Sequence, residues 1–316
     1  MLQVENLSKR YGKSVQAVDG LNLRIAKGEL FGFVGPNGAG KTTTMKIVAG
    51  LISADHGKVY VDGLDALYNQ KKIREKIGYM PDFFGVYDNL KVLEYMEFYA
   101  SLYGIEGKEA KRRCLEMLDF VKLSGVEDQY VDTLSRGIKQ RLCLARSMVH
   151  NPQLLILDEP ASGLDPRARM EMKELLHNLR ATGKTIIISS HILPELAEIC
   201  SSIGIMDKGK LRIKGIVEDI MTELNASKPL VMKFLERGER TMQCLKENHF
   251  VRNIVIQDNC ISVIFEGDER EEAGLLTSLI KSGAVISSYK RESGNLEELF
   301  MQITGGEKDH EDKSDL

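Results

Sequence analysis

The segment Gly35–Thr42 (GPNGAGKT) has the residue types and spacing of a phosphate-binding loop. Its glycines let successive backbone N–H groups converge on one anion, where the following helix also presents its positive dipole end. Lys41 could reach the terminal phosphates of a nucleotide, and the Thr42 hydroxyl could bind Mg²⁺. A chance glycine-rich turn would share the pattern, but this segment follows the apolar stretch Leu30–Val34 and precedes a predicted helix, as the motif requires.

Two carboxylates and a histidine follow continuous apolar runs further along the chain. Asp158 and Glu159 come directly after Leu154–Leu157, which predicts a strand buried on both faces. A carboxylate there can hold the water shell of Mg²⁺, and the adjacent glutamate could activate an attacking water. The pair could instead be a helix cap and a surface glutamate, although the upstream loop favours catalysis. His191 follows the run Thr185–Ser190 and is either a structural histidine or a phosphate contact.

The segment LSRGIKQR (Leu134–Arg141) opens a predicted amphipathic helix, with Arg136 wedged between Ser135 and Gly137. The expected apolar face consists of Ile138, Leu142, Ala145 and Val149. The expected polar face includes Lys139, Gln140 and Ser147. Taken by itself, this pattern is typical of a basic helix that binds nucleic acid or a lipid surface.

Strands alternate with helices over most of the chain, which predicts an α/β fold with a mainly parallel core sheet. Short strands are expected within residues 2–34, and a helix from Lys41 to about Gly50. Between Asn89 and Leu123 the sequence predicts two helical segments, separated by a break at Gly104–Gly107. Further helices are expected at 166–183 and after His191.

Beyond residue 225 the pattern changes to an α+β region. Strands are expected at 230–235, 251–256, 261–265 and 284–289, and helices at 240–248, 269–281 and 295–304. The polar, charged end of the chain is typical of disorder. We therefore expect a first domain over 1–225 that includes a helical subdomain at about 82–150, an accessory domain over 226–304, and a disordered tail over 305–316.

The composition of the 316-residue chain limits its class. Hydrophobic residues make up 43%, which supports buried cores, and the formal net charge of −3 gives no argument for bulk nucleic-acid binding. Five widely spaced cysteines without a C-x-x-C pair predict reduced thiols rather than disulfides or a zinc site. No signal-like region and no apolar run of ~20 residues is present, so we expect a soluble chain that reaches membranes only through a partner.

Residues 2–220 resemble the ATP-binding subunit of an ABC transporter, with the motifs in that family's order. Gly35–Thr43 matches the Walker A loop, and Leu154–Glu159 matches the Walker B motif. Ser162–Asp165 (SGLD) matches the D-loop. Leu134–Arg141 matches the signature motif, usually written L-S-G-G-Q, which is the most specific of these elements because many P-loop proteins lack it.

The resemblance implies a fold and a set of site residues. The fold is a P-loop NTPase of ABC type, with a mainly parallel core, an antiparallel N-terminal part, a helical signature subdomain and a small α+β C-terminal domain. Implied ATP-binding residues are Tyr11, Gly35, Pro36, Asn37, Gly38, Ala39, Gly40, Lys41, Thr42, Thr43, Ser135 and Gly137. Implied catalytic residues are Glu159, His191 and Lys41, and implied metal ligands are Thr42, Asp158 and Asp82. Tyr11 would stack on adenine, unless it is only a core or surface aromatic.

Two positions depart from the family pattern. Arg136 stands where a glycine is usual, and Asp82 stands where a glutamine is usual. Asp82 is shorter than glutamine and charged, so it either acts near Mg²⁺ and the attacking water or only caps the turn after Pro81. Arg136 either adds a cation near the phosphates or points outward.

The resemblance also implies partners. Because each motif occurs once, ATP would lie between the Walker A loop of one subunit and the signature of a second, most simply in a homodimer. A separate integral-membrane permease would hold the protein at the inner face of the cell membrane, on the cytoplasmic side, and the C-terminal extension is similar to that of exporter-type ATPases. Phe83, Phe84 and Tyr87 are expected on the permease-facing surface, unless the aromatics of this stretch only form the core of the helical subdomain. The alternative is a non-transport ABC ATPase acting on ribosomes or DNA, although no nucleic-acid partner is expected. The signature disfavours a small-molecule kinase.

Overall fold

The computed structural model describes residues 1–12, 14–83, 85, 89–226 and 229–291. By their contacts these residues form two compact units, which divide between Val217 and Glu218. The sequence placed this boundary after residue 225, and helix α8 (Val217–Ala226) lies between the two positions. The helix expected at 295–304 and the tail at 305–316 lie outside the described residues. We describe each unit by itself.

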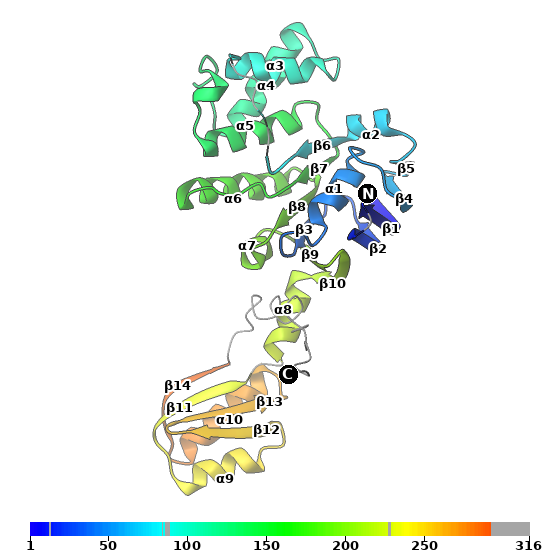
Figure 1. Cartoon of the computed structure of the whole chain (residues 1–316). Helices are drawn as coiled ribbons and strands as arrows, with labels where there is room; N and C mark the ends of the chain where they lie inside the picture. The colour runs from blue at the N-terminus through cyan, green and yellow to red at the C-terminus, as the bar shows by residue number, and fades with distance from the viewer. Residues whose placement is uncertain (13, 84, 86–88, 227–228, 292–316) are drawn as a thin grey trace, which may run out of the picture. The chain divides into compact units, whose positions relative to one another are not determined.

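A six-stranded sheet forms the centre of the first unit (Figure 1). Its strands are β3 (Leu30–Val34), β6 (Ile77–Met80), β7 (Leu154–Leu157), β8 (Thr185–Ser190), β9 (Ser202–Asp207) and β10 (Lys210–Ile216). The order is β10-β9-β3-β8-β7-β6, parallel throughout except that β10 pairs antiparallel with β9. Every residue of β3, β7, β8 and β9 is buried, as expected for strands covered on both faces. The predicted mainly parallel core is confirmed.

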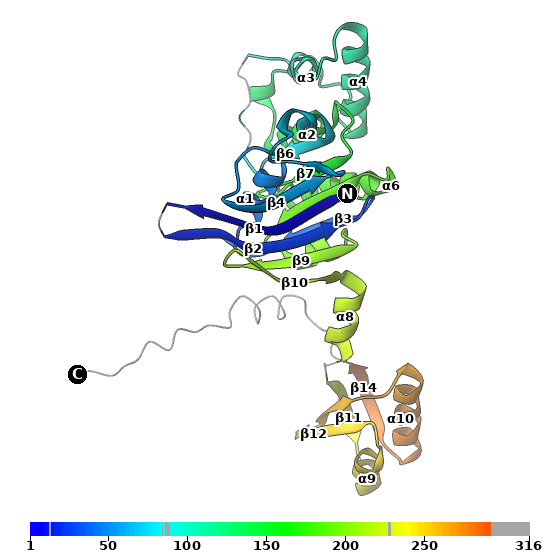
Figure 2. The same cartoon turned by 90° about the vertical axis from the view of Figure 1, so that its right-hand side faces the viewer.

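A second, antiparallel sheet carries the N-terminus (Figure 2). It contains β1 (Leu2–Tyr11), β2 (Val15–Ile25), β4 (His56–Val61) and β5 (Leu64–Asp65), in the order β2-β1-β4-β5. One buried cluster joins Leu21 of this sheet, Phe33 of the central sheet and Met45 of helix α1 (Lys41–Val48). Helix α1 therefore stands in a core shared by both sheets, which fixes the position of the loop before it.

The remaining helices of this unit include a group at the top of the view in Figure 1. That group is α3 (Val92–Ser101), α4 (Gly107–Phe120) and α5 (Arg136–Met148), with a 3₁₀ turn at Val131–Thr133. The others are α2 (Gln70–Lys76), α6 (Pro166–Ala181) and α7 (Leu193–Ala197). The break expected at Gly104–Gly107 separates α3 from α4, and both of these glycines have positive φ.

The predicted polar face of α5 is wrong at Gln140 and Ser147, whose exposed fractions are 2% and 4%. A Cβ added to Gly78 of β6 would lie only 2.1 Å from the carbonyl oxygen of Ser147, so α5 packs directly on that strand. Ile138, expected on the apolar face, is only half-buried. Helix α5 is thus covered on more than one side and offers no broad basic surface.

The second unit has the βαββαβ order of a ferredoxin-like fold. Its elements are β11 (Leu230–Glu236), α9 (Glu239–Glu247), β12 (Val251–Gln257), β13 (Cys260–Phe265), α10 (Glu269–Lys281) and β14 (Val285–Arg291). All three strand pairs in the sheet β12-β13-β11-β14 are antiparallel. Phe234, Leu245 and Leu279 belong to a core that α9 and α10 share with the sheet. This unit follows the element order expected for residues 230–289.

Two further expectations from the sequence concern membrane-spanning segments and the cysteine thiols. Within the described parts of the chain, no helix is both long enough and apolar enough to span a bilayer. All five cysteines are free, as predicted. Cys114, Cys143 and Cys200 are buried, and burial raises the pKa of each thiol.

Candidate nucleotide-binding site

The loop between β3 and α1 needs glycine at two positions where other backbones approach. A Cβ on Gly35 would lie 2.4 Å from the carbonyl oxygen of Met206, and a Cβ on Gly40 would lie 2.2 Å from that of Ala17. Gly40 also has a φ of 104°, in the region that favours glycine. The loop is therefore held against β2 and β9 where the unpaired N–H groups of the α1 N-terminus begin. Within this loop lie Pro36, Asn37, Gly38 and Ala39, and Thr42 and Thr43 follow in the first turn of α1.

The Lys41 ammonium is buried within the loop that it follows. Its Nζ donates to the carbonyl oxygens of Gly35 at 2.6 Å and Pro36 at 3.3 Å, and lies 3.6 Å from Glu159 Oε1. Burial lowers the pKa of Lys41, while the carboxylates of Glu159 and Asp158 oppose that shift. A cation held in this way is available to an incoming phosphate, which can replace the loop carbonyls as its partner.

Asp158 directly follows β7, with its side chain turned toward Thr42 of α1. Its Oδ1 accepts from Thr42 Oγ1 at 3.0 Å and from Ser189 Oγ at 2.7 Å, and its Oδ2 accepts from the Tyr79 hydroxyl at 3.4 Å. Burial, followed by the Asp158 charge, raises the pKa of Tyr79, which keeps that hydroxyl a donor. The adjacent oxygens of Thr42 and Asp158 suit Mg²⁺, which binds few protein oxygens and takes its other ligands from phosphates and water.

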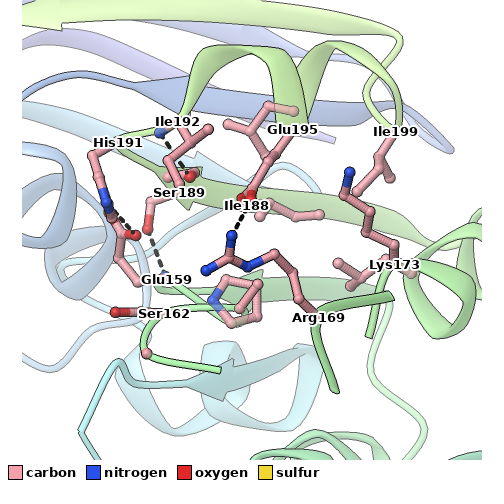
Figure 3. Close-up of a pocket in the computed structure, with 16 residues that line it drawn as sticks. Glu159, Ser162, Arg169, Lys173, Ile188, Ser189, His191, Ile192, Glu195 and Ile199 are labelled. Atoms are coloured by element: carbon pink, nitrogen blue, oxygen red, sulfur yellow. Dashed lines mark hydrogen bonds and ion pairs between the residues drawn. The ribbon is translucent and has the colours of Figure 1, made fainter. Parts of the chain in front are cut away.

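Glu159 lies between Lys41 and His191 at the edge of the central sheet. Figure 3 shows its contact with His191. Its Oε1 faces Lys41 and its Oε2 lies 3.0 Å from His191 Nδ1. Its N–H donates to Ser189 Oγ at 2.9 Å, and its φ of 49° is unusual for a non-glycine residue. This backbone conformation turns the chain sharply after β7 and directs the carboxylate toward the phosphate loop.

Within the part of the chain that the structure describes, Asp82 makes no direct contact with the Thr42–Asp158 pair through a hydrogen bond. Among the described residues no cluster of three or more His, Cys, Asp or Glu side chains forms a metal site. Burial and then the charges of Asp158 and Glu159 raise the pKa of Asp82, although the residue is exposed to solvent. Its part in holding a metal remains a prediction.

Tyr11, Ser135 and Gly137 stand outside this cluster of side chains. Tyr11 ends β1 with 46% of its surface exposed, and Lys9 Nζ lies 5.8 Å from the ring centroid. Ser135 caps α5, and its Oγ accepts from the Ile138 N–H at 3.4 Å. No hydrogen bond between described groups connects Ser135 or Gly137 with the phosphate loop of the same chain.

Sequence reasoning missed four contacts at this site. Ser189 binds both Asp158 and the Glu159 backbone, and Tyr79 reaches Asp158 from β6. A serine at the end of an otherwise apolar buried strand was the available signal for Ser189. Arg136 Nη2 donates to the carbonyl oxygen of Ser162 at 3.1 Å, which no local pattern indicated.

Comparison with known proteins gives the family of the chain. The family model described as ABC transporter matches residues 18–162. The linearmycin resistance ATP-binding protein LnrL of Bacillus subtilis (strain 168) is 32% identical over 96% of this chain and 98% of its own length. The bacitracin transport ATP-binding protein BcrA of Bacillus licheniformis is 34% identical over 97% of this chain and 98% of its own length.

The chain belongs to the ABC transporter family. It is an ATP-hydrolysing subunit of an ABC transporter, and its first unit is the ABC-type P-loop domain that the motifs predicted. A solved dimer of the ATP-binding cassette MJ0796, described as a post-hydrolysis state bound to ADP and Pi, has a TM-score of 0.63. The two are 27% identical, and the match covers 69% of this chain and 99% of the cassette. ABC ATPase domains thus dimerise and hydrolyse ATP on this fold.

Proposed function

We propose that two copies of this chain assemble head to tail, with each ATP held between the Walker A loop of one copy and the signature of the other. The supporting observation is the separation within one chain: Lys41 lies in the loop, whereas Ser135 and Gly137 open α5 without contact to it. A hydroxyl and a helix N-terminus are good ligands for a phosphate, and here they require a phosphate supplied by a second chain.

The residues at the sheet edge have distinct roles in hydrolysis. Glu159 accepts the proton of the attacking water, and Lys41 offsets the charge of the phosphates. His191 holds the Glu159 carboxylate through the 3.0 Å contact and approaches the terminal phosphate. Thr42 and Asp158 would hold Mg²⁺, which supplies charge neutralisation to the phosphate oxygens when bound. Tyr11 provides an exposed ring on which adenine can stack.

The chain drives export through a separate membrane permease, at whose cytoplasmic side it binds. The names of the relatives support export: bacitracin transport in Bacillus licheniformis, and Nod factor export in a Ralstonia nicotianae protein that is 30% identical over 97% of this chain. Phe83 is 87% exposed, which suits a partner contact. Phe84 and Tyr87 of the same predicted surface lie outside the described residues. The unit from Glu218 to Leu299 serves as an accessory domain.

Copurification tests this assignment. Tagged protein expressed in its own host should fractionate with membranes and bring down a polytopic membrane protein. Phe83→Ala should reduce that yield while leaving ATP binding unchanged, whereas Tyr68→Ala, at an aromatic that is 88% exposed, serves as the matched control. Recovery with ribosomes or DNA instead of membranes would support the non-transport alternative.

A further inference from the structure

The loop that follows Glu159 is held by arginines from two helices. Arg136 at the start of α5 donates to the Ser162 carbonyl oxygen at 3.1 Å. Arg169 of α6 donates to the Leu164 carbonyl oxygen at 3.4 Å and lies 3.3 Å from Glu195 of α7. Figure 3 shows Arg169 directed at Glu195 beside this loop. The loop is thereby connected to the signature helix on one side and to the helix after His191 on the other.

The Arg136 guanidinium lies flat over Gly163. A Cβ added to Gly163 would meet Cζ, Nη2 and Nη1 of Arg136 at 2.4, 2.5 and 2.6 Å, nearly equal distances that place the plane of the group across the glycine. Gly163 has a φ of 65°, so the loop turns tightly beneath the guanidinium. The close approach requires both a planar side chain at 136 and the absence of a side chain at 163.

We propose that Arg136 is a positioning residue that fastens the loop carrying Ser162 and Gly163 to the signature helix of the same subunit. The loop begins three residues after Glu159, so its position bears on the carboxylate that activates water. This inference rests on the proposed roles of Glu159 and the signature. Arg136, which stands where the family usually has glycine, thus serves a contact within the chain and does not add a cation at the phosphates.

The side chain of Arg136 is exposed to solvent. A role in positioning the loop can therefore be distinguished from a role in stabilising the fold. A hydrogen bond at an exposed site contributes little to global stability. Removing it should therefore leave the unfolding temperature within about 2 °C of wild type. The effect should appear instead in the mobility of residues 159–165 and in turnover.

A double-mutant cycle on the full-length chain tests the contact, with Arg136→Gly, Gly163→Ala and the double variant. We measure kcat and KM for ATP, and deuterium uptake of residues 159–165 without nucleotide. Each single change should raise that uptake and lower kcat roughly fivefold, with KM within about twofold. The double variant should be no slower than Gly163→Ala alone, because both changes break one contact.

Two further variants keep the result interpretable. Arg136→Met retains the stem and removes the donors, and should raise uptake as the glycine variant does. Arg167→Gln removes an arginine of the same groove whose side chain is 90% exposed, and should leave uptake and kcat unchanged. Unchanged uptake in both Arg136 variants, or a kcat loss in the double variant equal to the product of the single losses, would overturn the proposal. If uptake rises but Glu159→Gln still turns over ATP, the proposed role of Glu159 fails and the Arg136 contact stands.

Discussion

His191 Nδ1 lies 3.0 Å from Glu159 Oε2, although a loop and the whole of helix α6 separate the two residues along the chain. They meet because β7 and β8 are parallel neighbours that end at the same edge of the sheet. Lys41 approaches the other oxygen of the same carboxylate. Glu159 is therefore oriented from two sides by residues of its own chain.

Glu159→Gln should abolish turnover while preserving ATP binding. The amide keeps the shape of the side chain but cannot accept a proton from water, so we expect kcat to fall by at least about 100-fold. Because ATP would remain bound between subunits, the variant should accumulate as an ATP-bound dimer in size-exclusion chromatography. Hydrolysis at the wild-type rate would contradict the assignment of Glu159 as the base, and Glu171→Gln on α6 is a matched control.

The glycines of the Walker A loop should differ in their tolerance of alanine. Gly38 and Gly40 both have positive φ, which costs roughly 1–2 kcal/mol for an L residue. Only Gly40 adds a steric conflict, since its Cβ would lie 2.2 Å from the Ala17 carbonyl oxygen, whereas nothing lies within 4 Å at Gly38. Gly40→Ala should therefore destabilise the chain by about 1–3 kcal/mol more than Gly38→Ala. Denaturant unfolding of both variants measures the difference, and equal losses would mean that the loop relaxes freely.

Asp82→Asn should stabilise the protein at neutral pH. The pKa of Asp82 is raised above its ordinary value of 3.8, so the folded state favours the protonated carboxyl. The protonated carboxyl therefore contributes favourably to the free energy of unfolding below the unfolded pKa. This contribution is lost as the pH rises through the higher pKa of the folded state. The asparagine variant should thus melt at a higher temperature than wild type at pH 7. The difference between the two melting temperatures should become smaller as the pH falls toward about 4. The gain should be small, because solvent screens an exposed charge. A lower melting temperature of the variant at pH 7 would contradict the prediction.

Tyr11 should contribute to ATP affinity through its ring alone. Loss of one aromatic stacking partner weakens binding by roughly three- to tenfold, so Tyr11→Ala should raise the Kd for ATP by that amount. Tyr11→Phe retains the ring and should bind within about twofold of wild type. Binding titrations on the Glu159→Gln background avoid hydrolysis during the measurement. Equal affinity of the alanine and phenylalanine variants would remove Tyr11 from the site.

The sequence by itself determined the elements whose signals are local. The glycine spacing of Gly35–Thr42, the apolar run before Asp158 and the run before His191 depend only on neighbouring residues, and all three predicted the right kind of segment. Regular periodicity likewise placed α10 at Glu269–Lys281. The strands β9 and β10 and the helices α2 and α8 were missed. Strand β10 is only partly buried and α2 is short, so that neither has a strong apolar pattern.

Only the tertiary structure decided which of these residues meet. Ser189 against Asp158, Thr42 against Asp158 and Arg136 over Gly163 join residues that are distant in sequence. Such contacts depend on strand order and on how closely helices approach, which a periodic pattern does not encode. The same reason explains the error at Gln140 and Ser147: helical spacing gave them a polar face, and the packing of α5 on β6 and its neighbouring helices buried it.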